Sequence, residues 1–222
     1  MLPLYINGGT LTLSRARRSK GRKVSHEMNE PPPANRPMRA DARRNYASLL
    51  SAARVAISER GADIVLEDVA RSAGVAIGTL YRHFPTRQDL LEAVFLEEAN
   101  ELREHAEALA SAPVPFDALM NWLRLQMDFA ARGQSMGAAV MAAKRVPGTR
   151  SYAAHKAMLE AGNVLLLRAQ AAGQIRTDVH LVDVIRLVYG IVMVNEHASD
   201  PDGATRMLDL VIAGIRTKPS RD

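Results

Sequence analysis

Cysteine is absent from this chain of 222 residues, and aromatic residues make up only 5% of it. Without thiols the chain has neither disulfide bonds nor thiolate ligands for a metal ion. No apolar run approaches the roughly 18 to 20 residues that a membrane-spanning helix needs. The apolar N-terminus is followed, not preceded, by its basic cluster, which is the wrong order for a secretory signal. These absences favour a cytoplasmic protein without a membrane partner.

The chain also lacks the motifs that many enzyme classes require. It has no catalytic pair of carboxylates, no phosphate-binding loop, no nucleophile elbow and no metal-ligand spacing. His155 and Glu160 are five residues apart, which is a poor spacing for two ligands on one helix face. The sequence therefore predicts no metal, no cofactor and no enzymatic activity.

Alanine and leucine are abundant, whereas clusters of β-branched and aromatic residues are scarce, so the composition favours helices over sheets. The length suffices for one or two domains with a good core. Apolar spacing, glycines and prolines predict helices at residues 40–60, 66–73, 77–84, 87–109, 116–131, 135–144, 149–172, 181–198 and 202–216. The buried stripe of the first helix is expected to contain Tyr46, Leu49, Leu50, Ala53 and Ile57.

The net charge of +5 is distributed unevenly along the chain. Residues 1–38 hold seven basic and two acidic residues, residues 39–88 hold eight and five, and residues 89–222 hold fourteen and seventeen. The chain beyond residue 38 is therefore neutral as a whole but positive at its N-terminal end. A surface that binds nucleic acid needs this polarity.

Residues 1–38 are predicted to be a disordered tail, because a basic run at 15–23 and three prolines at 31–33 leave no usable periodicity. The basic run could be an extra arm that adds salt-dependent affinity for phosphates. Alternatively the tail is merely solvated, or the true start is Met28 or Met38. We favour these two simpler readings.

The most informative stretch is EDVARSAGVAIGTLYRHFPTRQDL, at residues 67–90. Its pattern predicts two short helices joined by a tight turn, in which Gly74 supplies the left-handed residue that ends the first helix. The second helix turns Leu80 and Phe84 inward, which leaves a hydroxyl, a phenol, a guanidinium and an imidazole facing outward. Such a face suits a phosphate backbone and the edges of a groove, as in the helix-turn-helix. Thr86, with Asp89 three residues later, resembles the capping box of a further helix.

This stretch resembles the DNA-binding signature of the tetracycline-repressor (TetR) family of transcriptional regulators, because the turn glycine, the Gly-Thr-Leu-Tyr run and His-Phe-Pro coincide. The match is strong from Ala42 to Leu96, and beyond Leu96 only the helical layout agrees. The resemblance implies an all-α fold of about nine helices without strands. It implies a three-helix helix-turn-helix DNA-binding domain at 39–86 and a helical ligand-binding and dimerisation domain at 87–222. The implied function is that of a dimeric repressor, released from double-stranded operator DNA by a small-molecule effector.

The DNA-binding residues expected from the resemblance and the residue chemistry are Arg43, Arg44, Ile77, Gly78, Thr79, Tyr81, Arg82, His83 and Arg87. Tyr81 and His83 are expected to donate to phosphate oxygens, and Arg87 to meet a phosphate beside the free amides of its helix. Arg82 is the expected base reader, since a guanidinium can bind guanine in bidentate fashion. The alternatives are a Tyr81 half-buried against the first helix and an inert surface role for the other two side chains.

One residue departs from the family pattern. Family members often carry threonine at the start of the second helix, where its oxygen caps the helix and touches DNA, whereas this chain has Val65. The loss of such a cap costs about 0.5 to 2 kcal/mol. We therefore expect a frayed helix and one missing phosphate contact.

Specific DNA binding by a helix-turn-helix normally requires a dimer on a two-fold site. The last two predicted helices carry apolar faces that are too extensive to remain in water, although packing within one subunit would also explain them. The expected dimer-interface residues are Leu181, Val184, Ile185, Val188, Ile191, Met207, Leu208, Val211 and Ile215.

The remaining helices are expected to surround a ligand cavity, because methionine accepts varied apolar partners. The candidate ligand-binding residues are Trp122, Met127, Met141, Tyr152, Met158, Tyr189, Met193 and His197. Each of them could instead belong to an ordinary core. Two further functions remain open at this point. One is a helical small-molecule binder or enzyme with a vestigial helix-turn-helix, and the other is an interaction protein whose basic tail meets acidic partners.

Overall fold

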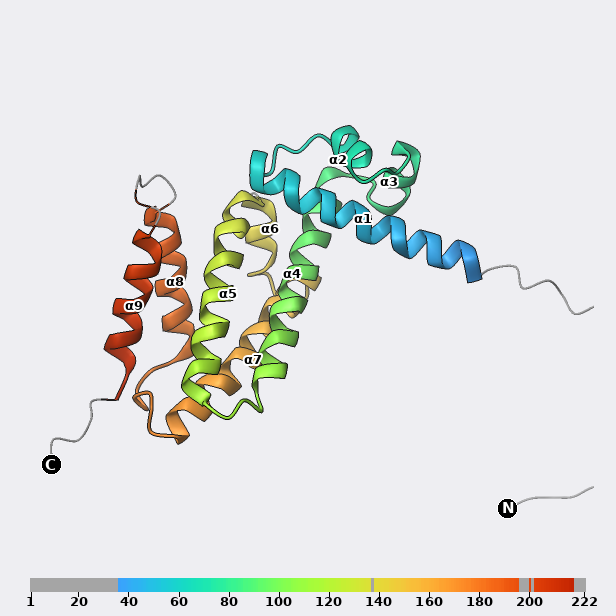
Figure 1. The fold of residues 1–222 in the computed structure, drawn as a ribbon. Helices are drawn as coiled ribbons and strands as arrows, with labels where there is room; N and C mark the ends of the chain where they lie inside the picture. Colours follow the sequence, from blue (N-terminus) through green and yellow to red (C-terminus); the bar gives the residue numbers. More distant parts are fainter. Residues whose placement is uncertain (1–35, 137, 196–199, 201, 218–222) are drawn as a thin grey trace, which may run out of the picture. The chain divides into compact units, whose positions relative to one another are not determined.

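The computed structural model describes residues 36–136, 138–195, 200 and 202–217, without the side chains of 36–39, 133–135, 138 and 139. Within these residues the chain forms nine helices, and one isolated antiparallel bridge joins Ile175 to Arg216 (Figure 1). The helices are α1 (Arg36–Arg60), α2 (Leu66–Ser72), α3 (Ile77–His83), α4 (Arg87–Leu109), α5 (Pro115–Ser135), α6 (Ala138–Ala143), α7 (Arg150–Ala171), α8 (Leu181–Asn195) and α9 (Gly203–Ile215). The predicted all-α fold is confirmed for this part of the chain.

The predicted helix boundaries are mostly close to the observed ones. Helix α4 has the predicted bounds, whereas α1 begins at Arg36 instead of Ala40 and α5 continues to Ser135 instead of Ala131. Residues 196–198, which were predicted to end α8, lie outside the described residues.

Helices α1 to α3 pack around Leu49, Leu80 and Phe84, which are all buried. Gly61 and Gly74 adopt positive φ angles of 65° and 67°, so they end α1 and open the turn between α2 and α3 as predicted. The expectation that Tyr46 belongs to the buried stripe of α1 is wrong, because its side chain is 37% exposed. Its ring lies at the rim of the core, 5.2 Å from the ring of Phe84 between centroids.

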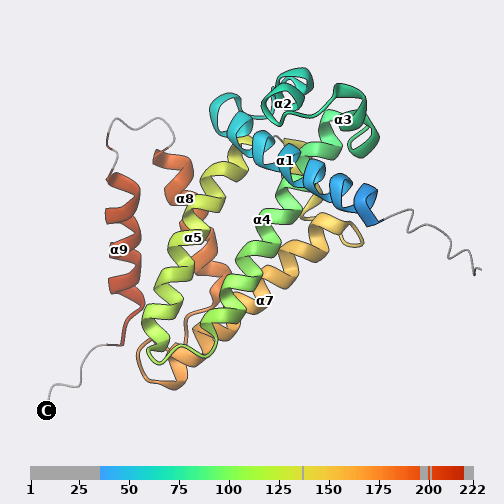
Figure 2. The same cartoon turned by 45° about the vertical axis from the view of Figure 1, so that its right-hand side comes forward.

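Helix α4 begins directly after α3 and then runs the length of the C-terminal helices, packed against α5 and α7 (Figure 2). Its start is fixed by the predicted capping box, in which the Thr86 hydroxyl accepts from the Asp89 amide at 3.2 Å and the Asp89 carboxylate accepts from the Thr86 amide at 2.9 Å. Beyond its other end, the Arg168 guanidinium of α7 donates to the carbonyl oxygen of Ala112 at 2.9 Å. Helix α4 is therefore anchored near both ends.

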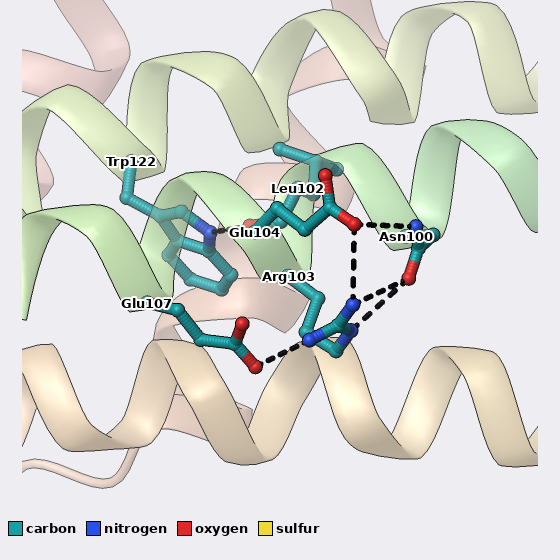
Figure 3. A network of polar contacts seen from close by, with 6 residues as sticks. All are labelled: Asn100, Leu102, Arg103, Glu104, Glu107 and Trp122. Atoms are coloured by element: carbon teal, nitrogen blue, oxygen red, sulfur yellow. Dashed lines mark hydrogen bonds and ion pairs between the residues drawn. The ribbon is translucent and has the colours of Figure 1, made fainter.

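Trp122 of α5 joins α4 and α7 at the centre of the C-terminal half. Its indole Nε1–H donates to the carbonyl oxygen of Leu102 at 2.9 Å (Figure 3). Its ring lies against Gly162 of α7, where an added Cβ would be only 2.2 Å from the ring. On the outer side of α4, Arg103 bonds to Asn100 and Glu107 (Figure 3). The glycine and the indole thus let α5 and α7 approach each other closely.

Candidate DNA-binding surface and ligand cleft

The outer face of α3 presents the polar residues that the sequence predicted. Leu80 is buried beneath α3, whereas Tyr81 is 44% exposed and Arg82 is exposed beside it. Thr79 and His83 are half-buried, and Ile77 and Gly78 are exposed at the N-terminal end of α3. This face arises because Gly74 reverses the chain and Val75 N–H then bonds to the carbonyl oxygen of Ala70 at 2.9 Å.

The side chains of this face differ in their partners. The Tyr81 hydroxyl donates to Glu67 Oε1 of α2 at 3.3 Å, and the charge of Glu67 raises the pKa of Tyr81. The His83 ring meets Tyr46 of α1 edge-on, with 5.7 Å between centroids, so His83 is held in place instead of being free on the surface. Arg82 has no hydrogen bond or ion pair to any described residue. Its guanidinium is therefore available to another molecule.

The other predicted arginines are exposed, and two of them form ion pairs. Arg87 lies 3.3 Å from Asp63, and Arg44 pairs with Asp41 one helical turn away. Arg43 is exposed on α1. Exposed pairs contribute little to stability, so a phosphate can replace the aspartates without a large loss.

Val65, the residue before helix α2, makes no side-chain hydrogen bond to the free amides of the helix, as the sequence predicted. Ala76 likewise leaves the start of α3 without such a cap. Both helices have seven residues and depend on packing for their stability.

The structure brings only some of the predicted ligand-binding residues together. Trp122 and Met158 are sealed in the core, where the indole N–H is already used and the Met158 sulfur accepts from Gln126 at 3.3 Å. These two residues therefore do not reach a cavity on the described surface. Met127 and Met141 are half-buried against the core, and His197 lies outside the described residues.

Tyr152, Tyr189 and Met193 line a cleft formed mainly by α7 and α8. The cleft consists of two hollows of about 460 Å³ and about 530 Å³, which share His155, Leu159 and Val182. This size is typical of a small-molecule site. Lys144 also lines the larger hollow, and it could not be recognised from the sequence because a single lysine after a short helix carries no signal.

Most residues expected at a dimer interface are buried within the chain itself. Leu181, Val184, Ile185, Val188, Ile191 and Leu208 are all buried, and only Met207 is exposed, while Val211 and Ile215 are half-buried. These faces pack within one subunit, which was the simpler alternative for most of the set. Apart from Met207, the exposed apolar residues of the two helices are not among those expected, and the most exposed are Val194 at 70% and Leu210 at 73%.

Sequence reasoning also missed a charged cluster that joins α1, α4 and α5. Glu98 of α4 is only 3% exposed, and its carboxylate lies 3.1 Å from Arg132 of α5 and 3.9 Å from Arg54 of α1. Arg54 also pairs with Glu101 at 2.7 Å. Burial raises the pKa of Glu98 against the opposing influence of the two arginines. Glu98 on its own looks like one more acidic residue of a long polar helix face, so only the packing reveals its role.

No described group of three or more histidine, aspartate or glutamate side chains could hold a metal ion. The described helices include none that is long and apolar enough to cross a membrane.

A three-helix unit with an exposed polar recognition helix, followed by helices around a cleft, defines a helix-turn-helix regulator. The comparisons with known proteins agree with this class. Residues 49–94 match the family described as bacterial regulatory proteins of the tetR family, and residues 114–217 match the C-terminal domain of SbtR-like transcriptional regulators.

Two crystal structures illustrate the similarity. A TetR transcriptional regulator from Streptomyces coelicolor is 36% identical, with 78% of this chain and 99% of that chain covered and a TM-score of 0.65. A TetR regulatory protein from Mycobacterium vanbaalenii is 30% identical, with 82% and 100% covered and a TM-score of 0.63. No curated protein sequence matches the chain. The chain belongs to the TetR family of DNA-binding transcriptional regulators, which are not enzymes.

Proposed function

We propose that this regulator is a homodimeric repressor that a small molecule releases from operator DNA in the cytoplasm. The observation that carries the proposal is the exposed face of α3, where Arg82 lacks any described partner and Tyr81 is 44% exposed. We assign DNA binding to residues 39–86 and ligand binding and dimerisation to 87–222.

In the proposed complex α3 enters the major groove, where some of its side chains contact phosphates and others contact bases. Tyr81, His83 and Arg87 contact phosphates and thereby fix the orientation of the helix, while base edges specify the sequence. Arg82 binds O6 and N7 of a guanine. On DNA the Tyr81 hydroxyl exchanges Glu67 for a phosphate oxygen as its acceptor.

The dimer is proposed to form through the exposed apolar faces of α8 and α9. Leu187 and Val194 on α8, and Met207 and Leu210 on α9, are all exposed in the single chain. Helix α9 lies beside α8 at one edge of the helical array, so both faces can meet a second copy (Figure 1). Burial of these side chains at about 25 cal/mol per Å² favours association.

Release requires that the ligand prefer one arrangement of the two DNA-binding heads. Helix α4 is the proposed lever, because it begins beside α3 and packs along α7, which forms one wall of the cleft. The Glu98 cluster supports this assignment, since its carboxylate contacts arginines of both α1 and α5. A shift of α7 on ligand binding is thereby transmitted to α1.

The test is selection of duplexes from a random pool by the full chain, followed by gel-shift titration of the enriched duplex. We expect a two-fold symmetric sequence, and Arg82→Ala to lose about 1–3 kcal/mol of discrimination at one base pair of each half-site. Arg124→Ala is the matched control, because Arg124 is an exposed arginine on α5 and the variant changes the net charge equally. Enrichment of no sequence at low salt would overturn the proposal.

A further inference from the structure

The larger hollow of the cleft is lined by charges of one sign. Among the described residues, Lys144, Arg145 and Arg186 are its charged residues apart from the titratable His155, and no described carboxylate lines it. Arg186 already pairs with Asp183 at 3.1 Å, whereas neither Lys144 nor Arg145 pairs with any described carboxylate. A negatively charged ligand would therefore balance the positive charge of this wall.

Lys144 is the most unusual of these groups, because its side chain is only 7% exposed. Its ammonium donates to the Tyr189 hydroxyl at 3.3 Å and lies 4.5 Å from the centre of the Tyr189 ring. Burial and then the charge of Arg145 lower the pKa of Lys144 to about 8, so most of the ammonium remains charged near neutral pH. A buried cation without a counter-ion is costly, and an anionic ligand would remove much of that cost.

His155 of α7 supplies a second unmet polar group at the junction of the two hollows. Its Nδ1 is buried and has no hydrogen-bond partner. Burial, Lys144 and Arg145 lower the pKa of His155 to about 4, so the ring is neutral near pH 7. A neutral imidazole can donate one hydrogen bond through the tautomer that the ligand selects.

The second hollow is apolar on the side that adjoins His155. Leu159 and Val182 line both hollows, and Leu181 lines the second one. The acid and base at its rim, Glu160 and Lys156, are 3.6 Å apart and satisfy each other. The cleft is thus cationic at one end and apolar along the other.

We propose that this cleft binds a small monocarboxylate, with its carboxylate at Lys144 and His155 and its apolar body along Leu159 and Val182. This inference rests on the proposed function, because the monocarboxylate would be the effector of the repressor. A single negative charge fits better than a phosphate dianion, since Lys144 is the one cationic side chain buried in the described part of the wall.

Isothermal titration of the full chain with octanoate and with 1-naphthoate tests the site without DNA. We expect each carboxylate to bind at least tenfold more tightly than its neutral amide, octanamide or 1-naphthamide, because hydrogen bonds to charged groups are the strong ones. Lys144→Met should weaken carboxylate binding tenfold or more, and Lys144→Arg should retain most of it.

Lys156→Met is the matched control, because it removes the same charge from the same cleft at a lysine already paired with Glu160. Its carboxylate affinity should change less than threefold. Equal losses in the two methionine variants, or equal affinity for acid and amide, would overturn the proposal. Since Lys144→Met removes an uncompensated buried charge, the apo variant should melt at or above the wild-type temperature, which separates lost binding from lost folding.

Gel shift with the selected duplex then distinguishes the two proposals. Carboxylate binding with release of DNA supports both of them. Carboxylate binding without release upholds the site and contradicts the release mechanism. DNA binding by a chain that binds neither carboxylate contradicts the site and leaves the DNA-binding role intact.

Discussion

The two functional ends of this molecule are built in different ways. The polar face of α3 comes from four residues of one short helix, Thr79, Tyr81, Arg82 and His83. Its neighbours Arg87 and Arg44 form exposed ion pairs that cost little to exchange. The cleft brings together Lys144, His155 and Tyr189 from separate parts of the chain and holds a buried charge among them. The face of α3 can therefore exchange its partners in water, whereas the cleft holds polar groups that lack a partner among the described residues.

The largest effect is expected from the proposed dimer face. The double variant Leu187→Arg, Leu210→Arg places four charges in a two-fold interface and should yield monomers in sedimentation experiments. Operator affinity should fall about 10²- to 10⁴-fold, because the second head no longer binds as part of the same molecule.

Leu167→Arg, at another exposed apolar residue on α7, serves as the control and should remain dimeric. If the double variant still sediments as a dimer, the subunits meet elsewhere.

The pH dependence of the free energy of unfolding above pH 8, measured without ligand, tests whether the ammonium of Lys144 is buried. Because the pKa of Lys144 is lowered from 10.5 to about 8, the unfolded chain binds more protons between these values. The free energy of unfolding should therefore rise as the pH increases from about 8 to about 10.5, by at most about 3 kcal/mol. Arg145, Arg186, His155 and Tyr189 line the same hollow as the ammonium. Burial raises the pKa of Tyr189 to about 12, so its phenol lowers the free energy of unfolding as the pH rises above about 10. The rise due to Lys144 is therefore read between about pH 8 and pH 10.

Lys144→Met should lose this rise in urea denaturation curves collected across the same pH range. A rise of equal size in wild type and variant would show that another group is responsible.

Substitutions at two glycines should affect different properties: Gly162→Ala the stability of the C-terminal helices, and Gly78→Ala the binding of DNA. Gly162→Ala drives a Cβ into Trp122, so we expect it to lower the free energy of unfolding by about 1–3 kcal/mol. Gly78→Ala meets no atom within 4 Å, so it should leave the free energy of unfolding unchanged or raise it.

Thermal melts of both variants, with the operator titrations, complete this comparison. Gly78→Ala should weaken only DNA binding, because an added methyl group would keep the exposed start of α3 farther from the DNA. A Gly162→Ala protein as stable as wild type would contradict the packing of α5 on α7.

The smallest effect is expected at the missing cap. Val65→Thr should stabilise α2 by about 0.5–2 kcal/mol and tighten operator binding, because a hydroxyl can accept from the free amides of the helix. Val65→Ala is the control, since it shortens the side chain without adding an acceptor. Unchanged affinity in Val65→Thr would show that the position takes no part in binding.

The contrast between the α3 face and the cleft also explains which features the sequence could predict. Gly74, Val65 and the Thr86–Asp89 capping box act through residues within a few positions of one another, so their patterns predicted α2, α3 and the start of α4 correctly. Such local rules hold wherever the chain places the element.

The cleft and the dimer face depend on packing between distant segments. Trp122 could not be recognised as sealed, because the slot for its ring is created by Gly162, forty residues later. Helix α8 is apolar on more than one side, so its periodicity does not reveal which side faces another helix. The Glu98 cluster and Lys144 escaped notice for the same reason, since their partners lie on other helices.

The most direct test of the central claim is the sedimentation stoichiometry of the full chain on its selected duplex, for wild type and for Arg82→Ala. We predict two chains per duplex for wild type, with salt-dependent affinity, and a clearly weaker complex on that duplex for Arg82→Ala. One chain per duplex, bound equally well by both proteins, would contradict the account.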